Sequence, residues 1–184
     1  TTINATSGAI DMSATDNPIA INGNFTFTGS NNLDLGDGAI TMGASRSITT
    51  SANTLTMGGV LTAATSTLTS AGAGGLAFDA QAVTLSGLVI SAGTLTSTSG
   101  VLSLAGDFDN DATFTHNNGN VTFNGTTDQN LGTSAGTQTF YDLTINNTGA
   151  DGSDDITLAD PVIVSNSLTL TDGHLYTDAT NVIT

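Results

Sequence analysis

The sequence predicts an all-β chain wound as a parallel β-solenoid with rungs of about 15–22 residues. The first observation is a short phrase in which two apolar residues flank a polar one. Its first copies begin at residues 10, 25, 40 and 55, so they lie 15 residues apart. The second observation is the composition, because Thr and Val favour pleated strands whereas Asn, Asp and Gly favour turns. A regular step of this kind is typical of a coil built from one repeated unit.

The same phrase continues along the rest of the chain at looser spacing. Further copies begin at residues 68, 83, 102, 121, 143, 156 and 168, so the later steps are uneven and predict rungs of unequal length. Within each phrase the two apolar side chains point to one face of the strand and the residue between them points to the other. We therefore expect aliphatic side chains to stack inward in successive turns and Thr side chains to face solvent.

A second ladder of apolar residues lies between the main phrases. Leu33, Ile48, Leu61 and Leu76 follow one another at nearly constant spacing, in step with the first ladder. Two ladders in fixed phase indicate two strands per repeat, with each turn laid on the turn below it.

The character of the sequence changes near residue 105. Residues 1–105 read as a regular short-rung solenoid, and residues 106–184 as its continuation with longer rungs that contain Asn, Asp and aromatic residues. No Pro-rich or charged linker lies between the two parts. We therefore expect one rod with a change of repeat type.

The charge of the chain disfavours several classes of partner. Its 184 residues carry 16 acidic side chains and a single Lys or Arg, for a formal net charge of −15. Nucleic-acid binding requires clustered Lys and Arg, and binding to an anionic membrane surface is disfavoured for the same reason. The sequence has no apolar run long enough to cross a bilayer, so we expect no membrane span. It also has no Cys, which excludes disulfide and thiolate chemistry.

Three segments in the second half of the chain carry a family resemblance. Gly106–Phe108, Ala112–Gly125 and Thr139–Gly149 are similar to the repeats of very large bacterial surface proteins, which are adhesin-like β-solenoids. Thr1–Ala5 resembles the strand repeats of autotransporter passenger regions. The similarity is best over residues 100–175. It implies a β-solenoid and an extracellular or cell-surface location.

One acidic segment is a candidate calcium site. Asp107, Asp109 and Asp111 alternate with other residues, which places their carboxylates on one outer face and Phe108 inside. Ca²⁺ takes six or more oxygen ligands, and an EF-type loop has Gly at its sixth position and a late bidentate carboxylate. Here the sixth position is Ala112 and the chain has no Glu, so a solvated turn is the alternative interpretation.

Asp151, Asp154 and Asp155 form a second acidic cluster. Divalent cations are candidate counterions for so acidic a chain, and a solvated, self-repelling surface is the alternative. We expect no resident cofactor, with calcium as the one candidate.

The sequence predicts no catalytic residue and therefore a protein that is not an enzyme. His116 and His174 lie far apart along the chain, and no Gly-x-Ser-x-Gly elbow accompanies them. Two His without clustered Cys or Glu make a poor zinc set, so we expect both at the surface or in corners. The only Arg, Arg46, has no acidic cluster near it in sequence, which disfavours the chemistry of β-helical lyases and hydrolases.

Six Thr-x-Thr pairs raise the alternative of an ice-binding surface. They begin at residues 26, 54, 67, 94, 113 and 169, so their steps are uneven and we expect that they do not form one matched face. The β-propensity of Thr explains outward Thr side chains without any ligand.

These observations predict a non-catalytic structural segment of an extracellular fibre or cell-surface stalk. Both ends read as strands without a polar cap, and an uncovered last turn favours the addition of further strands. We expect either that the polypeptide continues or that identical subunits stack head to tail, for adhesion or surface coating. The candidate partners are the chain itself and surface glycans. The alternative is a secreted binding module, either a glycan or host-surface adhesin or an ice-binding face.

Overall fold

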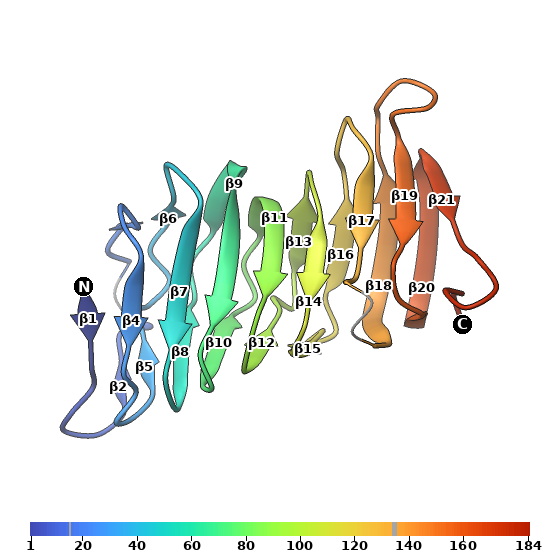
Figure 1. Cartoon of the computed structure of the whole chain (residues 1–184). Coiled ribbons are helices and arrows are strands. Elements are labelled where there is room, and N and C mark those ends of the chain that lie inside the picture. Colours follow the sequence, from blue (N-terminus) through green and yellow to red (C-terminus); the bar gives the residue numbers. More distant parts are fainter. Residues whose placement is uncertain (15, 134–135) are drawn as a thin grey trace.

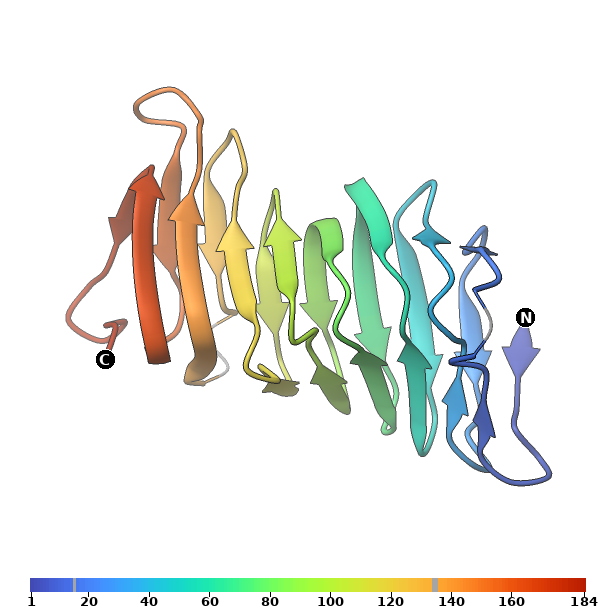
Figure 2. The same cartoon turned by 180° about the vertical axis from the view of Figure 1, so that it is seen from behind.

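The chain forms an elongated rod. The computed structural model describes residues 1–14, 16–133 and 136–184, which contain strands and turns but no helix, and so no helix long and apolar enough to cross a membrane. The rod has about eight turns, with the two termini at opposite ends (Figure 1). The strands pair in parallel from one end to the other, and successive turns lie side by side in the reverse view (Figure 2). The predicted all-β parallel solenoid is confirmed.

A full turn contributes three strand segments, which stack into three ladders along the rod. The first ladder contains β1 (Thr2–Ile3), β4 (Phe25–Phe27), β7 (Arg46–Thr50), β14 (Phe108–Asn110), β17 (Gln129–Leu131), β19 (Asp155–Leu158) and β21 (His174–Tyr176). The second contains β2 (Ile10–Asp11), β5 (Leu33–Asp34), β8 (Thr54–Met57), β10 (Gly75–Phe78), β12 (Thr94–Thr96) and β15 (Thr113–Thr115). The third contains β3 (Ile19–Ala20), β6 (Ile40–Thr41), β13 (Val101–Leu104) and β16 (Asn120–Phe123).

Four longer strands pass round a corner of the rod. They are β9 (Leu61–Ala71), β11 (Val83–Ile90), β18 (Gln138–Asn146) and β20 (Val162–Asp172). The first halves of β9 and β11 pair in the third ladder and their second halves in the first ladder. The second halves of β18 and β20 complete the third ladder.

The strand register shows where each turn closes. In the second ladder Leu55 lies beside Leu76, so one turn runs between these two residues. In the first ladder Phe108 lies beside Leu131, and Leu131 lies beside Leu158. The turn that begins at Leu131 is longer than the turn that begins at Leu55. The turns are therefore of unequal length, as the drifting steps predicted.

The regular step of the first four phrases is not a complete turn. Ile10 lies in the second ladder, Phe25 in the first and Ile40 in the third, so each step advances the chain by two of the three faces. Each turn therefore contains three strands, whereas the two series of apolar residues in the sequence predicted two strands per turn. The step from Val83 to Leu102, in contrast, is a whole turn, because these residues are neighbours in the third ladder.

The core is a narrow column of apolar side chains. Val83, Leu102, Val121 and Leu143 are successive neighbours in the third ladder, and each is at most 1% exposed. Burial of one such side chain contributes about 1.5–3 kcal/mol, so the column gains stability with each turn. Thr84, which follows Val83, is only partly buried. The predicted inward aliphatic and outward Thr pattern is confirmed here.

Residue 105, where we place the change of repeat type, lies in the corner between β13 and β14. The ladders run across this corner without interruption, since β13 pairs with both β11 and β16. The division into residues 1–105 and 106–184 stays a prediction about the repeat type.

Candidate functional site

The structure places the three carboxylates of the candidate calcium site along the outer side of β14. Asp107 and Asp111 are exposed and flank the strand, and Asp109 is partly buried within it. Burial raises the pKa of Asp109, and the charges of Asp107 and Asp111 raise it further. The next turn uses two of these carboxylates: Asn130 N donates to Asp107 Oδ1 (2.7 Å), and Thr133 Oγ1 donates to Asp111 Oδ1 (2.6 Å). Calcium binding at this segment stays a prediction.

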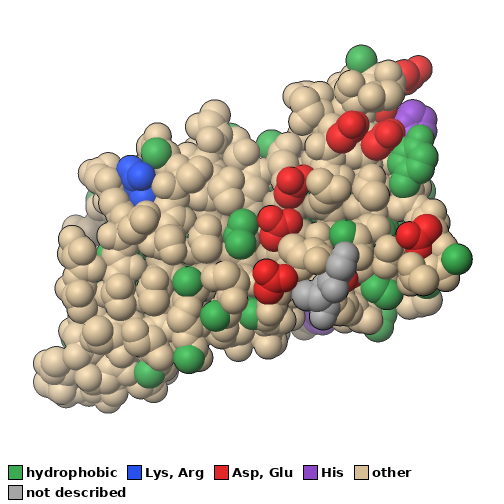
Figure 3. All heavy atoms as spheres, in the orientation of Figure 1, with side chains coloured by type: hydrophobic (Ala, Val, Ile, Leu, Met, Phe, Trp, Pro, Cys, Tyr) green, Lys and Arg blue, Asp and Glu red, His purple; other side chains and the backbone are tan. Residues whose placement is uncertain are grey.

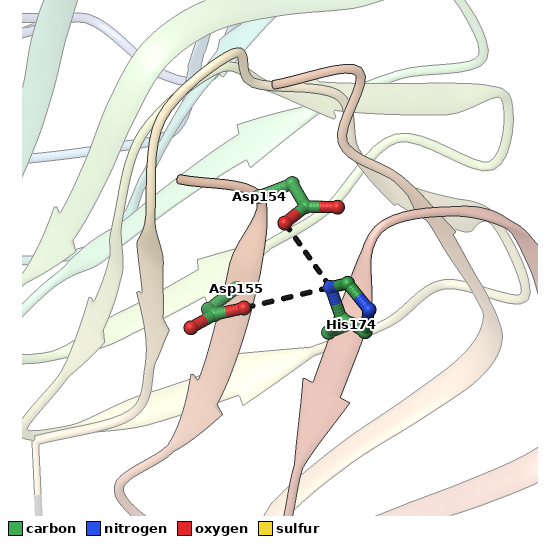
Figure 4. A group of neighbouring side chains, drawn as sticks. All are labelled: Asp154, Asp155 and His174. Carbon is green, nitrogen blue, oxygen red and sulfur yellow. Dashed lines mark hydrogen bonds and ion pairs between the residues drawn. The ribbon is translucent and has the colours of Figure 1, made fainter. Parts of the chain in front are cut away.

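The second acidic cluster acquires a histidine in the folded chain. Asp155 of β19 and His174 of β21 are direct register neighbours in the first ladder. His174 Nδ1 lies 3.1 Å from Asp154 Oδ1 and 3.6 Å from Asp155 Oδ1 (Figure 4). Within the described ranges, these three residues are the one group of three His or acidic side chains whose ligand atoms lie within 4.8 Å of one another.

Burial and charge differ among the members of this group. The Asp154 side chain is 5% exposed, the Asp155 side chain 28% and the His174 side chain 55%. The hydrogen bond with Asp154 raises the pKa of His174, and the charges of Asp154, Asp155 and Asp151 raise it further. Asp155 Oδ1 is buried and has no hydrogen-bond partner. Asp151 and Asp172 line the open pocket beside the group.

The other residues singled out for catalysis lie elsewhere. His116 follows β15, its Nδ1 accepts a hydrogen bond from Asn118 N (3.0 Å), and its ring packs 5.7 Å from that of Tyr141. Arg46 lies in β7, and its guanidinium donates to backbone carbonyl groups of the chain. The prediction that His116 and His174 lie at the surface or in corners agrees with their partly buried and exposed positions.

Three of the six Thr-x-Thr pairs share one face and the other three lie on the first and third ladders, which agrees with our expectation that the six pairs do not form one matched face. The pairs that begin at residues 54, 94 and 113 lie in β8, β12 and β15 of the second ladder. Thr94 is the register neighbour of Thr113, and Thr96 of Thr115. β10 interrupts the array, since Gly75 is the neighbour of Thr54 and Thr94. The sequence steps between the pairs are uneven because the other three pairs lie in other ladders and because the pairs at 54 and 94 are two turns apart.

The two ends of the rod expose apolar surface. At the N-terminal end a pocket of about 400 Å³ is lined by side chains that include Ile3, Ile19 and Phe25. At the C-terminal end Leu168 is 39% exposed and Leu170 65% exposed, although their register neighbours in β18 are at most 1% exposed. The last strand of the third ladder therefore presents core positions that no further turn covers.

Sequence reasoning missed a buried polar chain in the C-terminal half. Asn110 Nδ2 donates to Gln138 Oε1 (2.8 Å), and Gln138 Nε2 donates to Asp160 Oδ2 (2.9 Å). Asp160 also accepts from the backbone N–H groups of Thr133 (3.0 Å) and Gly136 (3.1 Å). All three side chains are at most 6% exposed. Each link joins residues of different turns, which leaves no local motif that predicts them.

We compared the chain with known proteins once this geometry was clear. No family model, no curated protein and no solved structure matches it.

Proposed function

We propose that this chain is a non-catalytic structural segment of an extracellular fibre or cell-surface stalk. The observation that carries the proposal is the exposed apolar surface at the two ends of the rod. Leu168 and Leu170 continue a buried column, so a further turn laid on β20 would bury both. The pocket at the other end, near Ile3 and Phe25, offers apolar surface in the same way.

Further turns extend the rod in either of two ways. The same polypeptide supplies them, or a second copy docks its N-terminal end on the C-terminal end of the first. The second contact joins two different surfaces, so it repeats without closing and produces a fibre. Unpaired strand edges at both ends favour this addition, because their backbone N–H and C=O groups can form hydrogen bonds with an added strand.

The charge of the rod favours contact at its ends over contact along its sides. On the face shown in Figure 3, acidic side chains gather over the C-terminal half, and the only Lys or Arg lies over the N-terminal half. A net charge of −15 keeps neighbouring rods apart laterally while the ends meet. We assign the segment to adhesion or surface coating, with surface glycans as the partner class.

Assembly of the purified chain tests the proposal. We expect electron microscopy to show filaments one rod wide, and sedimentation to show assembly that increases with concentration. Leu168→Asp places a charge in the end contact and should abolish assembly. Thr169→Asp, on the outward side of the same strand, is the matched control and should assemble as the parent chain does.

A tandem fusion tests the version in which one polypeptide continues. Two copies joined head to tail bury the end surfaces at the junction, so the fused chain should melt at a higher temperature than the single chain. Leu168→Asp in the first copy should remove the increase. Monomers at every concentration, together with a fusion that melts as the single chain does, would refute the structural role.

A second candidate function rests on the Thr side chains of the second ladder. The pairs in β12 and β15 present hydroxyl and methyl groups in register, and the pair in β8 continues them beyond the gap at β10, an arrangement that suits an ordered surface such as ice. A freezing-hysteresis assay tests this candidate. Thr94→Tyr and Thr113→Tyr should remove the activity and Thr122→Tyr, on the third ladder, should retain it, whereas a parent chain without hysteresis removes the ice-binding candidate.

A further inference from the structure

We propose that Asp154, Asp155 and His174 bind a divalent first-row transition-metal ion, with Zn²⁺ as the best fit. The site lies where β19 and β21 begin side by side in the first ladder (Figure 4). It is independent of the fibre proposal, because it uses side chains of one chain only.

Two of the three distances between the ligand atoms are close to those around a metal ion, and all three are within 4.8 Å. Zn²⁺ binds His nitrogen and carboxylate oxygen at roughly 2.0–2.2 Å in tetrahedral geometry. Two such bonds at a tetrahedral angle hold their ligand atoms about 3.3–3.5 Å apart. The separations here are 3.1 Å and 3.6 Å from His174 Nδ1 to Asp154 Oδ1 and Asp155 Oδ1. An ion therefore fits with small side-chain movements.

One oxygen in the group lacks the partner that its burial requires. Asp155 Oδ1 is buried without a hydrogen-bond donor, and it lies 3.6 Å from His174 Nδ1. A buried polar atom left in this way costs free energy, more so when it is charged. The Asp154 side chain is nine-tenths buried, and its Oδ1 lies 3.1 Å from His174 Nδ1. A cation between these side chains satisfies both oxygens at once.

The surroundings add negative charge and give the ion access. Asp151 and Asp172 line the same open pocket. No Lys or Arg balances their charge, because the only such residue, Arg46, lies in β7, toward the other end of the rod (Figure 1). The field in the pocket therefore attracts cations. The open side leaves room for water or a further carboxylate to complete the coordination.

The ligand types select the class of ion. Ca²⁺ takes six to eight oxygen ligands. An imidazole nitrogen with carboxylates instead suits Zn²⁺ and its first-row neighbours. Binding requires neutral imidazole with no proton on Nδ1, so protons compete with the ion and affinity should rise with pH.

The position of the site gives the ion a structural consequence. Asp155 and His174 belong to successive turns, so a bound ion joins β19 to β21. An ion that binds only the folded chain stabilises it in proportion to RT ln(1 + [ion]/Kd). The bound ion would therefore stabilise the last turn, in which core positions such as Leu168 and Leu170 are exposed.

Isothermal titration of the full chain with Zn²⁺ tests the inference. We expect one saturable site per chain, and at least about tenfold weaker binding after His174→Gln or Asp155→Asn, since each removes one of three ligands. His116→Gln is the matched histidine control and Asp109→Asn the matched carboxylate control, and both should bind as the parent chain does. Ca²⁺ should not compete at equal concentration.

Cobalt substitution reports on the coordination itself. Co²⁺ bound to the parent chain should show visible absorption bands that Zn²⁺ displaces and that His174→Gln lacks. Far-UV circular dichroism establishes that each variant keeps its β-structure, and where His174→Gln fails to fold, Asp155→Asn carries the comparison. The inference is overturned by the absence of a saturable site at millimolar Zn²⁺, or by equal loss of binding in the histidine control.

Discussion

The corners of the rod are built differently in its two halves. From β8 to β13 the buried polar side chains are small hydroxyls, and glycines close the corners against neighbouring backbone. From β14 to β20 the turns are longer and the buried polar side chains are amides and carboxylates. The members of the first set are Ser66, Ser70, Ser97 and Thr98, and those of the second are Asn110, Gln129, Gln138, Asn147, Asp154 and Asp160.

The difference shows how a solenoid accommodates a longer turn. A short corner satisfies its backbone groups through the turn below, as when Thr94 N donates to Gly74 O and Thr113 N to Gly93 O. A longer corner leaves more backbone N–H groups enclosed, and these need side-chain acceptors. Asp160 supplies such an acceptor for Thr133 N. The long turns therefore enclose amide and carboxylate acceptors, whereas the short turns use backbone acceptors and small hydroxyl side chains such as Thr98.

The largest expected effect is the loss of stability when a buried aromatic side chain of the core is removed, compared with removal of a buried aliphatic one. Leu88 and Phe108 are neighbours in the first ladder, and both are fully buried. Phe108 also packs against the rings of Phe114 (5.1 Å) and Phe140 (5.5 Å). Phe108→Ala should lower the free energy of unfolding by about 4 kcal/mol and Leu88→Ala by about 3 kcal/mol. Urea unfolding measures both values, and a larger loss for Leu88→Ala would contradict the comparison.

Removal of the buried carboxylate should be the next largest effect. Asp160→Ala leaves the N–H groups of Thr133 and Gly136 without their acceptor and removes one of the two acceptors of Gln138 Nε2. We expect a loss of about 3 kcal/mol in the free energy of unfolding, because buried donors then lack partners. Asp79→Ala, at an exposed corner of the short-turn half, is the control and should change it by less than about 0.5 kcal/mol. Equal effects in urea unfolding would remove the distinction between the two kinds of corner.

Adding a side chain at a short corner should lower the stability of the folded chain. Gly93 has a φ of +73°, and a Cβ there would overlap the carbonyl oxygens of Gly74 and Gly72. Gly93→Ala should therefore lower the free energy of unfolding by about 2 kcal/mol, from left-handed strain and the displaced backbone. Gly43→Ala is the control, since its φ is not left-handed and nothing lies within 4 Å of the added Cβ. If Gly93→Ala leaves the melting temperature unchanged, the backbone of these corners shifts to accommodate a side chain.

The sequence predicted the strands of this rod better than their register. The phrase of two apolar residues around Thr or Ser marks strands such as Leu55–Met57 and Leu102–Leu104 because burial on one face requires this alternation. It does not show how many phrases complete a turn, since corner length depends on local backbone geometry. The step from Ile10 to Phe25 and the step from Val83 to Leu102 consequently look alike, although the first covers two faces and the second a full turn.

The candidate metal site shows the same limit. Asp155 and His174 become neighbours only because the chain completes one whole turn between them. Their apolar neighbours, Ile156 and Leu175, carry the one signal that could have aligned them, since both occupy inward positions of the first ladder. Without the turn length, the acidic cluster and the histidine read as unrelated surface residues.

The smallest expected effect is a titration in the last corner. Asp178 Oδ1 accepts hydrogen bonds from Thr180 N and Asn181 N (both 2.7 Å), which lower the pKa of this carboxyl from 3.8 to about 2. A pKa that is lower in the folded chain means that the contribution to stability is complete above pH 3.8 and is lost as the pH falls through about 2. Carboxyl titration by NMR should place the pKa of Asp178 below 3.8, and Thr180→Ala, which removes the Oγ1 hydrogen bond alone, should raise this pKa only part of the way. A carboxyl of Asp178 that titrates near 3.8 in the folded chain would mean that the hydrogen bonds from Thr180 N and Asn181 N do not form in solution, and that this corner is open there.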